Sequence, residues 1–260
     1  MSSWIIAKSR PTNKKPIVSK YHSTSSSIDV FSIYMDFIAS YIYSQKMGET
    51  CSVWDSTNLL KSTLKVNPQV KYLKDEPQGV MPLSINDYRT FTKDMSFKDI
   101  QRIASTLISY DSNLNNTVIR VIEKAGIRVM FDIGIQIIKD PSGPNLGLLK
   151  KYASLLKSYQ AKLKKDSLNV YIMTDNYATV AHFQTYCDPS WKISTMSKNP
   201  PKDADAFVQT MAEVQIMVAL PALILDFERP IDRFIYLMQR NQRGLEYFTE
   251  INSEPWKLLA

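Results

Sequence analysis

The sequence feature that most constrains the fold is an alternation of side chains between residues 127 and 137. Isoleucine, valine or phenylalanine occupies every second position from Ile127 to Ile137, and Arg, Met, Asp, Gly and Gln lie between them. Successive side chains of a strand point to opposite faces, so a period of two is typical of a β-strand. We expect one strand here, or two strands that meet near Asp132.

Stretches of helical and strand character continue along the chain. The sequence predicts helices over 147–165, 207–218 and 231–239, and strands over 168–173, 191–195 and 222–227. Nearer the amino end it predicts strands over 4–7 and 51–54 around a helix that runs from Phe31 to Ile42. Such a succession is typical of an α/β protein with mostly parallel sheets, here organised as two Rossmann-like domains.

Positive charge is concentrated at one end of the chain. The formal net charge is +7, and the first 20 residues carry five bases and no acid, namely Lys8, Arg10, Lys14, Lys15 and Lys20. We therefore divide the chain into a basic arm with a short first strand (1–27), an amino-terminal α/β domain (28–112), a carboxy-terminal α/β domain (113–245) and a tail (246–260). The two domains and the tail together are nearly neutral.

Two interpretations of the basic arm remain open. It is either a solvated tail or an anchor onto an acidic surface, such as nucleic acid, phospholipid or an acidic protein partner. Its aromatic residues are not interleaved with the bases as a base-stacking surface requires, so we do not expect nucleic acid. A protein partner is the remaining specific expectation.

Other classes of protein are disfavoured by composition. Two cysteines in 260 residues fit a reducing compartment and structural thiols. His22 and His182 lie far apart in the sequence, and we expect no metal site. Asp203-Ala-Asp205 resembles a metal-binding D-x-D, but it directly precedes a predicted helix and is expected to cap it. With no targeting segment and no apolar run of membrane-spanning length, we expect a cytoplasmic protein.

The predicted topology points to one edge of the second domain as the ligand site. In open parallel sheets, ligands bind outside the carboxyl ends of the strands. This rule selects polar residues that follow the predicted strands: Lys139, Asp140, Thr174, Asp175, Asn176, Ser194, Thr195 and Asp226. Asp175 is also a candidate cap for the helix that follows it, and Arg233 opens a helix where an anion or a salt bridge could meet it.

Three stretches in this order resemble motifs of the fucosyltransferase family that contains the α-1,6- and protein O-fucosyltransferases. The run IGIQIIKD from Ile133 to Asp140 is similar to a family strand that ends in Gly-(Val/Ile)-His-(Val/Ile)-Arg-Arg. The run from Val170 to Asn176 is similar to a strand followed by Thr-Asp-Asp, and residues 222–236 to a strand, a Ser-Ser pair and an arginine that opens a helix. Residues 34–54 also resemble the family's first helix, turn and second strand.

The resemblance implies a GT-B architecture and transfer of a sugar from a GDP carrier to a glycan or hydroxyl acceptor, without metal or cofactor. It implies that the acceptor lies on the amino-terminal domain and the GDP-sugar on the carboxy-terminal domain. The nucleotide-sugar-binding residues carried over from the motifs are Gln136, Lys139, Asp175, Asn176 and Arg233. The general base is left open among Asp29, Asp36, Asp55 and Asp140.

Departures from the family pattern support a second hypothesis. Gln136 and Ile138 replace the family's histidine and first arginine, and Ile138 offers no donor to a diphosphate. Glu228 replaces a hydroxyl that would face phosphate. The chain also has only seven glycines, so few segments allow close backbone approach to a phosphate. The alternative is a catalytically silent copy that acts as a structural or binding protein, for example a virion-associated component of a large DNA virus capsid tethered by the basic arm.

Overall fold

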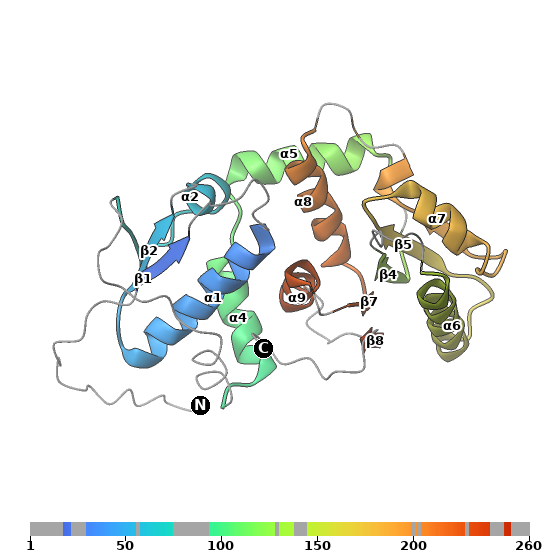
Figure 1. Ribbon diagram of the computed structural model, residues 1–260, viewed down its shortest axis with the longest axis horizontal. Helices are drawn as coiled ribbons and strands as arrows, with labels where there is room; N and C mark the ends of the chain where they lie inside the picture. The colour runs from blue at the N-terminus through green and yellow to red at the C-terminus, as the bar shows by residue number, and fades with distance from the viewer. Residues whose placement is uncertain are drawn as a thin grey trace. The chain divides into compact units, whose positions relative to one another are not determined.

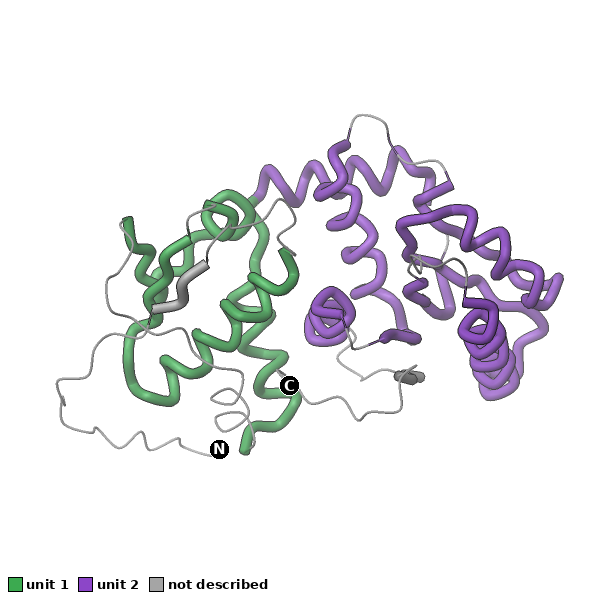
Figure 2. The backbone as a smooth tube through the Cα atoms, in the orientation of Figure 1, with its two compact units in different colours: residues 1–111, 257–260 green, residues 112–256 purple. Residues whose placement is uncertain are grey.

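The computed structural model describes residues 18–21, 30–55, 58–74, 94–127, 130–137, 145–198, 201, 204–226, 229–239 and 247–250. The chain divides into two compact units, which Figure 2 colours separately. Unit 1 comprises residues 1–111 and 257–260, and unit 2 comprises residues 112–256. The strand predicted over 4–7 lies outside the described residues. The domain roles proposed from the sequence stay predictions.

Unit 1 is built on a three-stranded parallel sheet (Figure 1). Its strands, in spatial order, are β1 (Val18–Tyr21), β2 (Cys51–Asp55) and β3 (Val70–Tyr72), and its helices are α1 (Val30–Met47), α2 (Leu59–Thr63) and α4 (Phe97–Leu107). The strand β1 falls within the segment that the sequence assigned to the basic arm.

The helix α1 confirms the prediction made from the spacing of its apolar residues. Phe31, Tyr34, Ile38 and Ile42 are all buried, and so are most of their neighbours. A helix that is apolar around most of its circumference is covered on several sides. It is followed by Gly48 with a φ of 68°, a left-handed backbone conformation that favours glycine at a helix end.

Unit 2 contains a five-stranded parallel sheet in the order β6-β5-β4-β7-β8. Its strands are β4 (Ile133–Gln136), β5 (Asn169–Met173), β6 (Lys192–Ser194), β7 (Ala222–Leu225) and β8 (Tyr247–Glu250). Its helices are α5 (Ser112–Lys124), α6 (Leu146–Leu163), α7 (Tyr177–Gln184), α8 (Ala206–Met217) and α9 (Pro230–Leu237), with a 3-10 turn η1 (Met196–Lys198). The strand β8 lies in the segment that the sequence assigned to a tail.

The two faces of this sheet are covered by different helices. Helices α6 and α7 lie on one side of the strands in Figure 1, and α8 and α9 lie on the other. Ile133 and Ile135 belong to the core cluster that contains α6 and α7 side chains. Gly134 lies against Leu220 and Met217 of the opposite layer. The alternation in the sequence thus separates two buried layers.

The length predicted for the alternating strand was wrong. Among the described residues of this stretch, strand is confined to Ile133–Gln136, Asp132 lies in a bend, and Met130 is 90% exposed. The Asp132 carboxylate accepts a hydrogen bond from the backbone N–H of Asn169 and pairs with Lys165. All four strand residues are buried, because a central parallel strand is covered on both faces.

The predicted α/β class with parallel sheets is confirmed. None of the described helices combines the length and hydrophobicity that a bilayer crossing requires.

Candidate functional site

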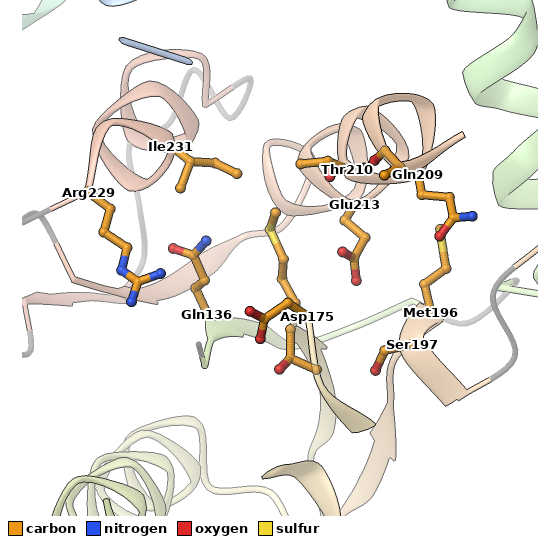
Figure 3. Close-up of a pocket in the computed structure, with 12 residues that line it drawn as sticks. Gln136, Asp175, Met196, Ser197, Gln209, Thr210, Glu213, Arg229 and Ile231 are labelled. Atoms are coloured by element: carbon orange, nitrogen blue, oxygen red, sulfur yellow. Dashed lines mark hydrogen bonds between the residues drawn. The ribbon is translucent and has the colours of Figure 1, made fainter. Parts of the chain in front are cut away.

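A cavity of about 410 Å³ opens beside the carboxyl ends of β4 and β5 in unit 2 (Figure 3). Four groups of residues line it: Gln136, Met173, Thr174 and Asp175 from the strand ends, Met196 and Ser197 from η1, Ala206, Gln209, Thr210 and Glu213 from α8, and Arg229 and Ile231 from the start of α9. Its position is the one expected for a ligand site in an open parallel sheet.

Gln136 is fixed at its backbone and at its side chain. The hydroxyl of Tyr152, on α6, donates to the backbone carbonyl of Gln136 over 2.9 Å. The side-chain amide of Gln136 faces the carboxyl group of Asp232 on α9, and its nitrogen donates there when that group is ionised. Both contacts are buried, so the residue at the end of β4 is held in place on two sides.

Asp232 is a fully buried carboxyl group in the first turn of α9. Burial raises its pKa well above the usual range, and the nearby charge of Asp226 raises the pKa further. Arg229, a hydrogen bond from the Asp226 backbone, and Arg233 act in the opposite direction. Its helix position also favours the charged form.

Glu213 is a second carboxyl group whose pKa is raised. It is half-buried in the wall of the cavity, and burial raises its pKa to about 8. The hydroxyl of Tyr171 donates to Glu213 Oε1 over 3.3 Å, which together with a backbone hydrogen bond from Thr174 limits the rise. Asp175 adds to the rise through its negative charge. Near neutral pH this carboxyl group is therefore mostly protonated.

The predicted residues that follow β5 have different positions. Asp175 is exposed and lines the cavity. Asn176 is the N-cap of α7, and its side chain accepts from the backbone N–H of Ala178 over 3.0 Å. Capping of this helix by Asp175 was therefore wrong. Thr174 Oγ1 accepts from the Asn176 backbone N–H over 3.2 Å and shapes the turn.

Two arginines lie near the start of α9. Arg229 is exposed, precedes Pro230 at the first turn and lines the cavity. Arg233 lies one turn further along α9 and is half-buried. It is not one of the described residues that line the cavity. Lys139 lies outside the described residues. The cavity thus brings together Gln136 and Asp175 of the five predicted site residues.

Sequence reasoning missed Glu213 and Arg229. Glu213 is the only acid in a helix whose inward positions are apolar, and this isolation was the available signal. Arg229 directly precedes Pro230, and proline is favoured at the first helical position. The start of the helix could therefore be predicted from the sequence. Neither signal by itself indicates a ligand.

Several local predictions can be checked on the described residues. Asp205 caps α8 by accepting from the Val208 backbone N–H over 2.7 Å, as expected. Cys51 and Cys187 are free thiols whose pKa values burial raises to about 11 and about 12. Within the described part of the chain, no group of three His, Cys, Asp or Glu side chains could hold a metal ion.

The two described candidates for a general base lie on different elements. Asp36 lies on α1, where desolvation raises its pKa to about 6. Asp55 accepts from the Leu60 backbone N–H over 2.8 Å and so stabilises the start of α2. Asp29 and Asp140 lie outside the described residues. The choice among them stays open.

Comparison with solved structures identifies the fold. The fucosyltransferase NodZ from Bradyrhizobium matches with a TM-score of 0.54 at 9% identity, over 86% of this chain and 93% of that one. Arabidopsis thaliana FUT1, in a mutant form in complex with GDP, matches with a TM-score of 0.62 at 9% identity, over 92% of this chain and 70% of that one. The chain has a fucosyltransferase-like fold.

This fold confirms the resemblance and the GT-B organisation expected from the sequence motifs, with one Rossmann-like sheet in each unit. A NodZ α-1,6-fucosyltransferase soaked with GDP-fucose also matches, with a TM-score of 0.54 at 11% identity. No protein family and no curated protein matches the chain by sequence. At these identities the likeness shows the fucosyltransferase-like fold alone.

Proposed function

We propose that the protein is a glycosyltransferase that binds a GDP-sugar in the cavity of unit 2 and transfers the sugar to a glycan or hydroxyl acceptor. The observation that carries the proposal is the position of this polar cavity beside the ends of β4 and β5 in a fucosyltransferase-like fold. The solved NodZ and FUT1 structures include complexes with GDP or GDP-fucose, which supports the choice of carrier.

The cavity offers matching groups for the two ends of such a donor. Arg229, at the start of α9, is a guanidinium that can pair with a diphosphate, and a helix N-terminus also favours negative charge. Glu213 and Asp175 supply acceptor oxygens for the N–H donors on one edge of a guanine base. Lys139 and Arg233 are further cations proposed for the diphosphate.

The proposed transfer forms one bond and breaks one. The acceptor hydroxyl oxygen attacks the anomeric carbon of the sugar, the bond from that carbon to the diphosphate oxygen breaks, and GDP leaves with the bonding electron pair. A carboxylate or water takes the hydroxyl proton. Inversion at the anomeric carbon follows from a single displacement.

A second candidate function is binding without transfer. The cavity is lined by two carboxyl groups, Asp175 and Glu213, against one arginine, Arg229, and the amide of Gln136 is engaged by Asp232. Even with Glu213 protonated near neutral pH, Asp175 opposes the arginine among the described lining residues, which is unfavourable for a diphosphate and favours a silent copy used as a binding or structural protein. A virion component tethered by the basic arm is one form of that alternative.

Calorimetric titration of the full chain with GDP and GDP-fucose tests the proposal. We expect micromolar binding that weakens by about tenfold or more in Arg229→Ala, because a charge-assisted contact is lost. Arg102→Ala, at an exposed arginine of α4 in unit 1, is the matched control and should bind as the wild type does. The absence of binding at millimolar nucleotide would contradict the proposal. Binding without release of GDP in the presence of glycan acceptors would select the silent copy.

A further inference from the structure

The amide of Gln136 is held on one side and lines the cavity. Its side chain rises from the end of β4 toward Ile231, between Arg229 and the residues of β5 (Figure 3). Its partner is the carboxyl group of Asp232, which is completely buried. An amide has a donor end and an acceptor end, so the end that Asp232 binds leaves the opposite end for the cavity.

The protonation state of Asp232 decides which end that is. An ionised carboxylate only accepts, so it binds the Gln136 nitrogen and leaves the Gln136 oxygen for a ligand. A protonated carboxyl group donates its hydrogen to the Gln136 oxygen and leaves the nitrogen for a ligand. We propose that Asp232 is a positioning residue that, through Gln136, sets whether a ligand in this cavity meets a hydrogen-bond acceptor or a donor.

The charged groups around Asp232 act in opposite directions on its ionisation. Asp226, at the end of β7, disfavours the ionised form, as does burial. Arg229 and Arg233 favour the ionised form. The hydroxyl of Tyr152 on α6 donates to the backbone carbonyl of Gln136, the partner of Asp232. Because the pKa of Asp232 is raised, the change of state occurs at a higher pH than for an ordinary aspartate.

The consequence for ligand choice is direct. A phosphate oxygen is an acceptor and favours the state in which Gln136 presents its nitrogen, whereas a sugar hydroxyl can donate to the Gln136 oxygen. The inference rests on the proposed function for the identity of the ligand. The amide reversal itself does not depend on that function and can be measured without nucleotide.

The first experiment follows the side-chain amide of Gln136 in the full chain by NMR across a pH titration, with its signal assigned by loss in Gln136→Met. We expect one titration step in the wild type and none in Asp232→Asn. In that variant the side chain at position 232 does not titrate, so the orientation of the Gln136 amide no longer depends on pH. An amide signal that does not titrate, or that titrates equally in Asp232→Asn, overturns the inference.

The second experiment measures pyrophosphate affinity by calorimetry across the pH range in which the first experiment finds the titration step. Two proteins are compared, one with Asp232 and one with Asp232→Asn. Both also carry Glu213→Gln, so the raised pKa of Glu213 does not contribute to the pH dependence. We expect the affinity of the Asp232 protein to fall about tenfold relative to the Asp232→Asn protein as Asp232 ionises, because a donor to the anion is lost. The comparison cancels the ionisation of pyrophosphate itself.

The outcomes separate this inference from the proposed function. A constant affinity ratio across pH overturns the inference, and so does a failure of the Asp232→Asn protein to bind pyrophosphate. If that variant does not fold, as thermal unfolding would show, Gln136→Met takes its place and should also remove the pH dependence. Amide reversal with no binding of GDP-fucose would defeat the proposed function and leave the inference standing.

Discussion

At the scale of single residues, the carboxyl of Glu213 gives the free energy of unfolding a distinct pH dependence. Its pKa is raised from 4.5 to about 8, so the folded chain keeps a proton that the unfolded chain releases between these values. The unfolding free energy therefore falls as pH rises through this window. The full shift corresponds to at most about 5 kcal/mol, and solvent in the half-open cavity reduces that figure. Thermal unfolding of wild type and Glu213→Gln at pH 5 and pH 8 measures the difference.

The expected result is that Glu213→Gln gains stability relative to the wild type at pH 8 and not at pH 5. Glu123→Gln, at an exposed position of α5, is the control and should follow the wild type at both pH values. Parallel curves for wild type and Glu213→Gln would show that Glu213 is ionised and solvated in the folded chain.

The distance between partners in the sequence explains which residues could be predicted. Asp205 caps α8 through a contact three residues away, so a local pattern was sufficient to predict it. The Tyr171–Glu213 bond joins residues 42 positions apart, and Gln136 and Asp232 are 96 positions apart. Only the folded sheet brings such pairs together, so the sequence could give the ligand edge but not the composition of its cavity.

At the scale of secondary-structure elements, Gly134 sets the separation between β4 and the layer that holds α8. A Cβ at this position would lie 2.6 Å from Leu220 Cδ1 and 2.7 Å from Met217 Sδ, and both side chains are buried. We expect Gly134→Ala to destabilise the chain by about 1–3 kcal/mol through overpacking. Chemical denaturation measures the change. Gly147→Ala in α6 is the matched control, since its Cβ meets nothing closer than 3.5 Å and alanine favours a helix.

A loss of stability in Gly134→Ala no larger than in Gly147→Ala would contradict this account. Gly134 belongs to the stretch that resembles a family motif, and the structure gives it a packing role. The alternation around it was visible in the sequence because isoleucines alternate with Gly134 and Gln136. Its burial on both faces was not readable, because an alternating pattern usually marks a strand with one solvated face.

At the scale of the whole molecule, the basic arm and the sheet of unit 1 share a short stretch of chain. The strand β1 starts at Val18 and pairs with β2 from Val18 to Tyr21, so Lys20 belongs to the sheet although its charge belongs to the arm's cluster. Deletion of residues 1–16 removes four of the five clustered bases and leaves this pairing intact. Deletion of residues 1–21 removes the pairing as well.

We therefore expect the shorter deletion to unfold at the temperature of the full chain and the longer one to unfold at a lower temperature, because an edge strand and its backbone hydrogen bonds are lost. Both deletions should bind a cation-exchange resin more weakly, since the net charge of +7 falls by four or five. If the arm is a tether, the shorter deletion is already sufficient to abolish capture of an acidic partner by the folded protein. An unchanged interaction with acidic surfaces would assign the arm no role beyond solvation, and equal unfolding temperatures for the two deletions would place the stability of unit 1 outside β1.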